Sequence, residues 1–249
     1  MVAKRRTAVG EQRTAEGGQR TAEPLTTRDL NRALLSRQML LAREKATVTE
    51  AVHRLIAMQA QVARPPFVGL WTRLSPFTRA DLLKALHART IVRATSLRGT
   101  IHVMAADDFV GLRGALQPAL TRGLEAILGD RIKDVDYAAL DQEARAFFHG
   151  QSATFDALRK HLKAKNAKTD ERALAYAIRV TLPLVQVPTD DRWGFPASAD
   201  FAIADTWLKR KISYTPIKIA KATAGSLVNA ANRKRNNDMN RCRAWPSSR

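Results

Sequence analysis

The chain has 249 residues, of which 45% are hydrophobic, so it holds enough apolar material for one large domain or two small ones. No apolar run approaches the roughly eighteen residues of a membrane-spanning helix, and the single cysteine, Cys242, excludes a disulfide framework and a cysteine-based zinc site. The net charge of +19 is compatible with a polyanionic partner or with an ordinary basic surface, and the five histidines, which lack HExxH or HxH spacing, predict no metal site.

Residues 1–24 are predicted to be a disordered leader. The pentapeptide Gln-Arg-Thr-Ala-Glu occurs at residues 12–16 and again at 19–23, and the segment has almost no core-forming side chains. Lys4-Arg5-Arg6 is not followed by an apolar stretch, so the leader is not expected to be a secretory signal. We therefore expect a cytoplasmic protein without a membrane partner.

Residues 25–104 predict a first compact unit. A threonine precedes each expected helix as a candidate N-cap: Thr26 or Thr27 for a helix over about 28–41, Thr47 or Thr49 for a helix that runs to about residue 60, and Thr78 for a third. Residues 91–96 and 100–104 are β-prone, and Leu97-Arg98-Gly99 can turn between them. Three helices followed by a hairpin is the order of a winged helix-turn-helix, a DNA-binding motif.

Residues 105–207 predict a second unit of similar order. Helices are expected over about 107–128, 137–148, 154–162 (capped by Ser152) and 170–180. A second hairpin is expected from residues 184–187 and 193–195, with residues 188–192 as its turn. The predicted fold class is therefore mainly α with small β-hairpins (α+β), arranged as tandem winged helix-turn-helix units.

Residues 208–249 are unlike the rest of the chain. They carry 11 basic residues and one acidic residue, which is more than half of the net charge, and they have weak periodicity. One interpretation is a basic tail that binds nucleic acid. The other, which we favour, is a frameshifted or truncated end; in either case we expect the segment to be disordered.

The tripeptide Gln59-Ala60-Gln61 is the first candidate for a site. It is predicted to lie where the second helix ends, directly before Arg64-Pro65-Pro66. Each carboxamide both donates and accepts hydrogen bonds, which suits contact with a sugar, a phosphate, a base edge or a water molecule. Taken alone, the pair is equally consistent with two solvent-facing side chains.

Further blocks follow the pair in a fixed order: Gly69-Leu70-Trp71, then Arg93, Arg98-Gly99-Thr100 and His102. This ordered set resembles the AlkZ/YcaQ-type winged-helix DNA glycosylases over about residues 25–207. The resemblance implies tandem winged helices closed by a C-terminal β-barrel, and excision of N-alkylated purines, some of them from interstrand crosslinks. The motif form, glutamine–apolar–glutamine, is that of the AlkZ branch, and it assigns Gln59 and Gln61 to the catalytic positions.

The residue chemistry is consistent with that activity. Alkylation at a purine ring nitrogen such as N7 makes the base cationic and a good leaving group, so no strong general acid is required. One glutamine carbonyl can orient the attacking water, and the other carboxamide can stabilise developing charge or fix the sugar. Which glutamine holds the water is left open by the sequence. No cofactor is expected.

The resemblance also suggests contacts to double-stranded DNA. Arg64, Arg93 and Arg98 are candidates for phosphate contacts, with solvated or internally paired arginines as the alternative. Thr100 and His102 belong to the same hairpin block, although a lone histidine on a strand is often structural. Trp71 is expected to fill the core rather than stack on a base, and Trp193 is open to either interpretation.

The chain departs from the family pattern after about residue 207. Family members continue into a third winged helix and the barrel, whereas here only the 42 atypical residues follow, so we expect a C-terminally truncated protein without the barrel. The resemblance then supports binding to alkylated or crosslinked DNA, by a nucleoid-associated monomer, more strongly than catalysis. The alternatives are a non-catalytic winged-helix DNA-binding protein, such as a regulator, and a degenerate product with an exposed core.

Overall fold

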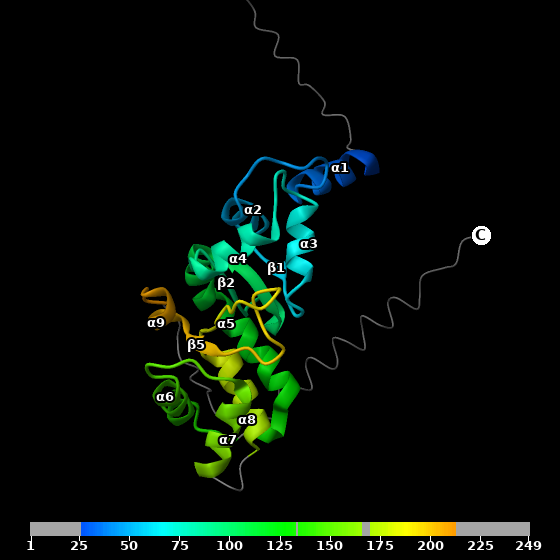
Figure 1. Ribbon diagram of the computed structural model, residues 1–249. Helices are drawn as coiled ribbons and strands as arrows, with labels where there is room; N and C mark the ends of the chain where they lie inside the picture. The colour runs from blue at the N-terminus through cyan, green and yellow to red at the C-terminus, as the bar shows by residue number, and fades with distance from the viewer. Residues whose placement is uncertain (1–25, 133, 166–169, 213–249) are drawn as a thin grey trace, which may run out of the picture. The chain divides into compact units, whose positions relative to one another are not determined.

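The computed structural model describes residues 26–132, 134–165 and 170–212 (Figure 1). The predictions for residues 1–24 and for 213–249 lie outside these described residues. The chain divides into two compact units, Met1–Ala42 and Arg43–Arg249. Each unit is described by itself.

The elements occur in the following order: α1 (Thr27–Arg37), α2 (Val48–Leu55), β1 (Met58–Gln59), α3 (Pro65–Trp71), α4 (Arg79–His87), β2 (Ile91–Thr95), the 3₁₀ turn η1 (Leu97–Gly99), β3 (Ile101–Ala105), α5 (Ala106–Leu128), the 3₁₀ turn η2 (Gly129–Ile132), α6 (Tyr137–Phe147), α7 (Phe155–Lys165), α8 (Glu171–Thr181), β4 (Leu184–Gln186), β5 (Phe201–Ile203) and α9 (Ala204–Leu208). The fold is mainly helical with a small antiparallel sheet, which confirms the α+β class.

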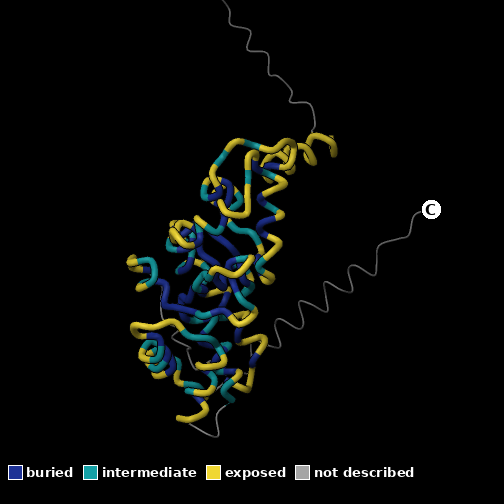
Figure 2. Tube along the Cα trace, viewed as in Figure 1, coloured by how far each residue is buried: buried dark blue, intermediate teal, exposed yellow. Residues whose placement is uncertain are grey.

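The first unit contains α1. Thr26 caps it in a capping box, because the backbone N–H of Asp29 donates to Thr26 Oγ1 and the Asp29 carboxylate accepts from the Thr26 backbone N–H. The helix ends at Arg37 rather than near residue 41. None of its residues is buried, and Figure 2 shows the segment as exposed.

In the second unit, capping boxes also start α2 and α4. Thr47 pairs with Glu50 and Thr78 pairs with Asp81, so the predicted caps at these two helices are confirmed. Helix α2 nevertheless stops at Leu55, because Ile56 takes a left-handed backbone conformation with a φ of 66°. The helix therefore ends before the glutamine pair.

One five-stranded sheet forms among the described residues, in the order β1-β3-β2-β4-β5, with every neighbouring pair antiparallel. The predicted first hairpin is confirmed as β2 and β3 around η1. The predicted second hairpin is wrong in its second strand. Residues 193–195 form a turn around Gly194, whose φ is 77°, and β4 pairs instead with β5.

Helices α5 to α8 pack against one another and on the β4–β5 end of the sheet, around the larger apolar core. The buried Arg113 guanidinium on α5 donates to the carbonyl oxygens of Val180, at 2.8 Å, and Thr181, at 3.2 Å. Arg113 therefore fixes the C-terminal end of α8, where the chain turns into β4. In Figure 2 the buried trace is concentrated in the strands and on the inward sides of these helices.

The sheet contains strands from both predicted winged-helix ranges. Ala94 of β2 faces Val185 of β4, so strands from the two predicted ranges are neighbours in the sheet. The division of the chain into tandem winged helices stays a prediction.

Candidate active site

The glutamine pair lies on the edge of the sheet. Gln59 is the second residue of β1 and faces His102 on β3, and the backbone N–H of Ala60 donates to the Ile101 carbonyl at 2.8 Å. The predicted position at a helix exit is therefore wrong, because the left-handed turn at Ile56 ends the helix and the chain joins the sheet before the first glutamine. Gln59 ends β1, and Gln61 lies in the bend that follows the strand.

The Gln61 carboxamide is held by the neighbouring strand. Its Oε1 accepts a hydrogen bond from the backbone N–H of Ile101 at 2.7 Å. Because a backbone N–H only donates, this contact fixes which end of the carboxamide is the oxygen. Among the described residues its amide NH₂ has no hydrogen-bond partner, so two donors are available to a ligand.

Arg93 binds the backbone of the glutamine motif. It is 6% exposed, and its guanidinium donates from Nε to the Ala60 carbonyl at 2.9 Å and from Nη2 to the Gln61 carbonyl at 3.1 Å. The Phe195 ring covers the guanidinium at 4.8 Å, and burial lowers the pKa of Arg93 to about 10. Arg93 therefore fixes the backbone of the glutamine motif instead of standing on an open surface.

Pro65 and Pro66 begin α3, so they start a helix and do not follow the end of one directly. Proline suits the first turn of a helix, where the missing N–H would have no intrahelical partner. On this helix Phe67 meets Trp193 edge to face, with ring centroids 5.1 Å apart.

Trp71 is 55% exposed and lies under Arg43 at 5.0 Å, so the prediction that it fills the core is wrong.

The β2–β3 turn carries the remaining predicted contacts. Arg98 is exposed at the tip, with a φ of 54°, and Thr100 is half-buried, with its hydroxyl donating to the Leu97 carbonyl. His102 is 5% exposed, and its Nδ1 donates to the Thr100 carbonyl at 3.0 Å. Burial and nearby Arg98 lower the pKa of His102, although the bond to Thr100 opposes the shift. The His102 imidazole is therefore buried. Of the three predicted contacts on this turn, only Arg98 and Thr100 reach the surface.

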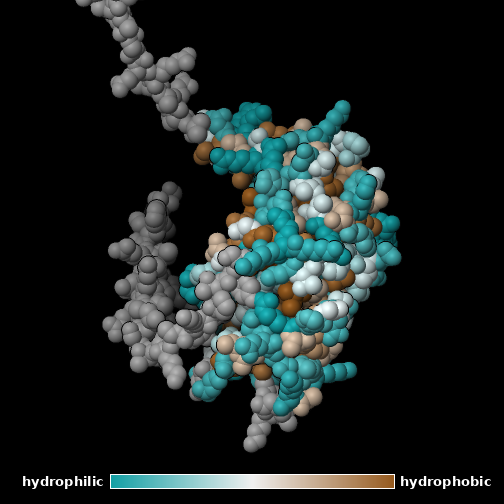
Figure 3. Space-filling view, turned by 90° about the vertical axis from the view of Figure 1, so that its left-hand side faces the viewer, coloured by the Kyte–Doolittle hydropathy of each residue, from teal (hydrophilic) through white to brown (hydrophobic). Residues whose placement is uncertain are grey.

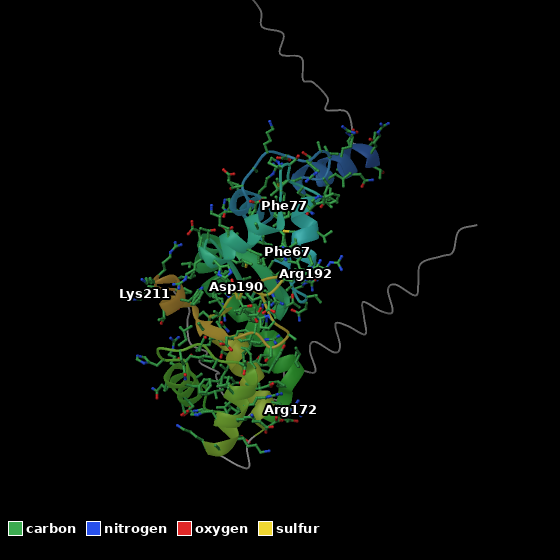
Figure 4. The ribbon with its side chains drawn as sticks, viewed as in Figure 1. Phe67, Phe77, Arg172, Asp190, Arg192 and Lys211 are labelled. Carbon is green, nitrogen blue, oxygen red and sulfur yellow. The ribbon has the colours of Figure 1, made fainter. Side chains whose placement is uncertain are left out.

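A cleft of about 630 Å³ opens beside the glutamine loop. Gln61 and Arg64 line one side, Trp193 and Phe195 of the β4–β5 loop line another, and Arg93 and Gln186 come from adjacent strands. Arg64 also lies over the Trp193 ring at 5.8 Å. Figure 4 labels Phe67 of α3 and Arg192, which precedes Trp193 in the loop. Gln59 is not among the residues that line the cleft.

The second half of the sequence adds cleft residues that were not predicted. Arg179 comes from the last turn of α8, Gln186 from β4 and Asp156 from the first turn of α7. The Gln186 side chain is 7% exposed, and its Oε1 accepts no hydrogen bond among the described residues. In the sequence, Gln186 stands out only as a polar residue within an apolar strand pattern. That pattern does not show that β4 lies next to β2.

The lining is positively charged. Arg64, Arg93 and Arg179 face a single acidic lining residue, Asp156, which is already paired with Arg159 on the next turn of α7. Figure 3 shows a mostly hydrophilic face with separate apolar patches. In the part of the chain that the structure describes, no cluster of three or more His, Cys, Asp or Glu side chains forms a metal site, and none of the described helices is long and apolar enough to cross a membrane.

A family model and a solved structure are similar to this chain. A family model described as DNA glycosylase AlkZ-like matches residues 52–235, roughly three-quarters of the chain, and so includes part of the basic segment 208–249. Among solved structures, Streptomyces sahachiroi DNA glycosylase AlkZ matches with a TM-score of 0.56 and 17% sequence identity, over 72% of this chain and 50% of that chain. This chain thus spans about half the length of the Streptomyces protein, and the likeness is one of fold. A search of curated proteins found no match.

Proposed function

The chain belongs to the AlkZ-like DNA glycosylase family. On that basis we propose that it hydrolyses the N-glycosidic bond of an N-alkylated purine in double-stranded DNA, where the purine carries a simple alkyl group or forms part of a crosslink. The observation that carries the proposal is the position of Gln61, which lines a cationic, aromatic cleft and is fixed there by two hydrogen-bonded contacts to the sheet. A cleft of this volume is of the size that holds a small molecule or a nucleotide.

The reaction places modest demands on the protein. An N7-alkylated purine is cationic, so the bond from C1′ to N9 breaks with its electron pair passing to the base. A water oxygen then bonds to C1′ of the oxocarbenium-like sugar, and its proton is released. The protein has to position that water and hold the sugar in place, and an ordered polar site is suited to both tasks.

We assign different roles to the two glutamines. The Gln61 oxygen already accepts a hydrogen bond from Ile101, so the amide NH₂ is the group with free hydrogen-bonding capacity. This NH₂ would donate to a sugar or phosphate oxygen. Gln59 is exposed and has no hydrogen-bond partner among the described residues, so its carbonyl would accept from the attacking water. Arg93 is a positioning residue, which acts through the backbone of Ala60 and Gln61.

DNA contacts would come from the rim of the cleft and from the β2–β3 turn. Arg64 and Arg98 are exposed and would bind phosphates, with Thr100 beside the turn as a further contact. His102 would support this turn from inside the sheet, through its bond to Thr100.

A second function is favoured by one observation. Because Gln59 does not line the cleft, the described residues are also compatible with a winged-helix protein that binds DNA without breaking a bond. Two measurements on the 249-residue chain separate these functions: release of free 7-methylguanine from a methylated duplex, and a binding titration on the same duplex. Release at a rate above spontaneous depurination supports the glycosylase, whereas binding without release supports the second function and contradicts the first.

A further inference from the structure

The cleft contains one arginine that the proposed mechanism does not use. Arg179 lies in the last turn of α8, and the bonds from Arg113 to the adjacent Val180 and Thr181 carbonyls fix that turn. The Arg179 side chain reaches the cleft, where it lines the same space as Gln61 and Arg64. Its position is therefore set by packed helices rather than by a free loop.

Arg179 has no ionic or hydrogen-bonded partner among the described residues. Its Nε is buried without an acceptor, and its guanidinium lies 5.5 Å above the Tyr176 ring. The two arginines that are buried in the described part of this chain do have main-chain partners, although Arg113 Nε, like Arg179 Nε, has no acceptor. Arg93 and Arg113 each donate to two main-chain carbonyl oxygens. Arg179 thus lacks the contacts that a purely structural arginine makes in this protein.

A partly buried guanidinium without acceptors is unfavourable until an anion or a carbonyl reaches it. Burial lowers the pKa of Arg179, which is the consequence expected for such a group. Asp156, the acidic residue in the lining of this cleft, is paired with Arg159. The cleft therefore needs an anion that the described residues do not provide.

We propose that Arg179 binds a backbone phosphate of the DNA strand whose nucleotide occupies the cleft. The planar guanidinium matches a phosphodiester, which accepts two parallel hydrogen bonds. The alternative ligand, the alkylated base, is itself cationic and would be repelled by Arg179. Two residues from different halves of the chain would therefore bind different parts of the nucleotide. Arg179, from the second half, would bind the phosphate, and Gln61, from the first half, would bind the sugar. This inference rests on the proposed function, because it takes DNA as the ligand.

The test compares DNA affinity at several salt concentrations for the 249-residue wild-type chain, Arg179→Met, Arg179→Lys and Arg172→Met. The probe is a short duplex that carries one 7-methylguanine. Arg172 is the matched control, because it lies on the same helix, is exposed and is labelled in Figure 4, and its loss changes the net charge equally. Thermal unfolding of each variant is measured in parallel.

We expect Arg179→Met to weaken binding about 10-fold and to reduce the slope of log affinity against log salt by about 1, because one phosphate contact is lost. Arg179→Lys keeps the charge but not the paired geometry, so its slope stays near wild type and its affinity falls by less. Arg172→Met changes affinity less than about 2-fold. Because Arg179 has no ionic or hydrogen-bonded partner among the described residues and contacts only the Tyr176 ring, Arg179→Met should unfold close to the wild-type temperature.

Unchanged affinity and slope in Arg179→Met would overturn the proposal, as would an equal loss in Arg172→Met, an unfolding temperature lowered in proportion to the lost affinity, or a wild-type chain that does not bind the duplex. Base release is scored separately. If the wild-type chain binds DNA in an Arg179-dependent manner but releases no base, the phosphate site stands and the glycosylase assignment fails.

Discussion

The role of each side chain at the candidate site depends on which of its hydrogen-bonding atoms are already used within the protein. Arg93 uses its donors on main-chain carbonyls, and Gln61 uses its oxygen on a main-chain N–H, so both are fixed by the sheet before any ligand arrives. The resemblance identified Gln61 and Arg93 as site residues. It did not distinguish a residue that contacts DNA from one that positions its neighbour, because that difference depends on which backbone atoms the fold brings within hydrogen-bond distance of the side chain.

Arg93→Met tests the positioning role. The substitution leaves the Ala60 and Gln61 carbonyls without their donors, so we expect a loss of about 1–3 kcal/mol in the free energy of unfolding. For the folded fraction, the single-turnover rate of base release should fall at least 10-fold while the DNA dissociation constant changes little, because the glutamine loop loses its geometry rather than its surface charge. Arg93→Lys should restore part of the rate. Equal losses in rate and affinity would contradict positioning.

His102 gives the protein a pH dependence of stability. Its folded-state pKa lies below the ordinary value of 6.5, so as the pH falls the unfolded chain takes up the proton first. The free energy of unfolding should therefore decrease as the pH falls below about 6.5, and this contribution should level off once the pH is below the folded-state pKa. Urea unfolding between pH 7 and pH 5 measures the effect. His102→Asn, which can keep the bond to Thr100, should show a flatter profile; an identical profile would rule out His102 as the source.

At the scale of elements, locally determined features were predictable and tertiary ones were not. Thr26, Thr47 and Thr78 start helices through contacts three residues away, so the sequence pattern located Thr78 and narrowed each of the other two caps to a pair of threonines. The second hairpin was misassigned because residues 193–195 are apolar for another reason: Trp193 and Phe195 pack on α3 and Arg93 across the cleft. The partner strand lies further along, at Phe201–Ile203.

The β4–β5 loop that carries Trp193 depends on Gly194. Its φ is 77°, and an added Cβ would lie 3.1 Å from Leu83 Cδ2, so Gly194→Ala should destabilise the protein by about 1–2 kcal/mol and weaken DNA binding through the displaced loop. Gly111→Ala is the matched control. It lies within α5 with no atom near the added Cβ, and it should stabilise the helix by about 0.5–1 kcal/mol. Thermal unfolding checks both signs, and destabilisation by both variants would contradict the explanation.

At the scale of the whole molecule, the candidate site is assembled from segments distant in sequence. The pairing of Ala94 with Val185 brings Gln186 next to Arg93 and brings the loop with Trp193 opposite the glutamine motif. Hydrophobic periodicity predicts the strands but not their order in the sheet. The resemblance therefore identified Gln59, Gln61 and Arg64, whereas Arg179 and Gln186 became visible only in the folded chain.

In the proposed function, the glutamine motif supports cleavage of the glycosidic bond. The most direct measurement is the single-turnover release of free 7-methylguanine from a methylated duplex, with protein in excess, for the wild-type chain, Gln59→Ala, Gln61→Ala and the exposed control Arg172→Met. We expect release by the wild type and the control, and rates at least about 100-fold lower in both glutamine variants at saturating protein. Release at the wild-type rate by both glutamine variants would contradict the proposed mechanism.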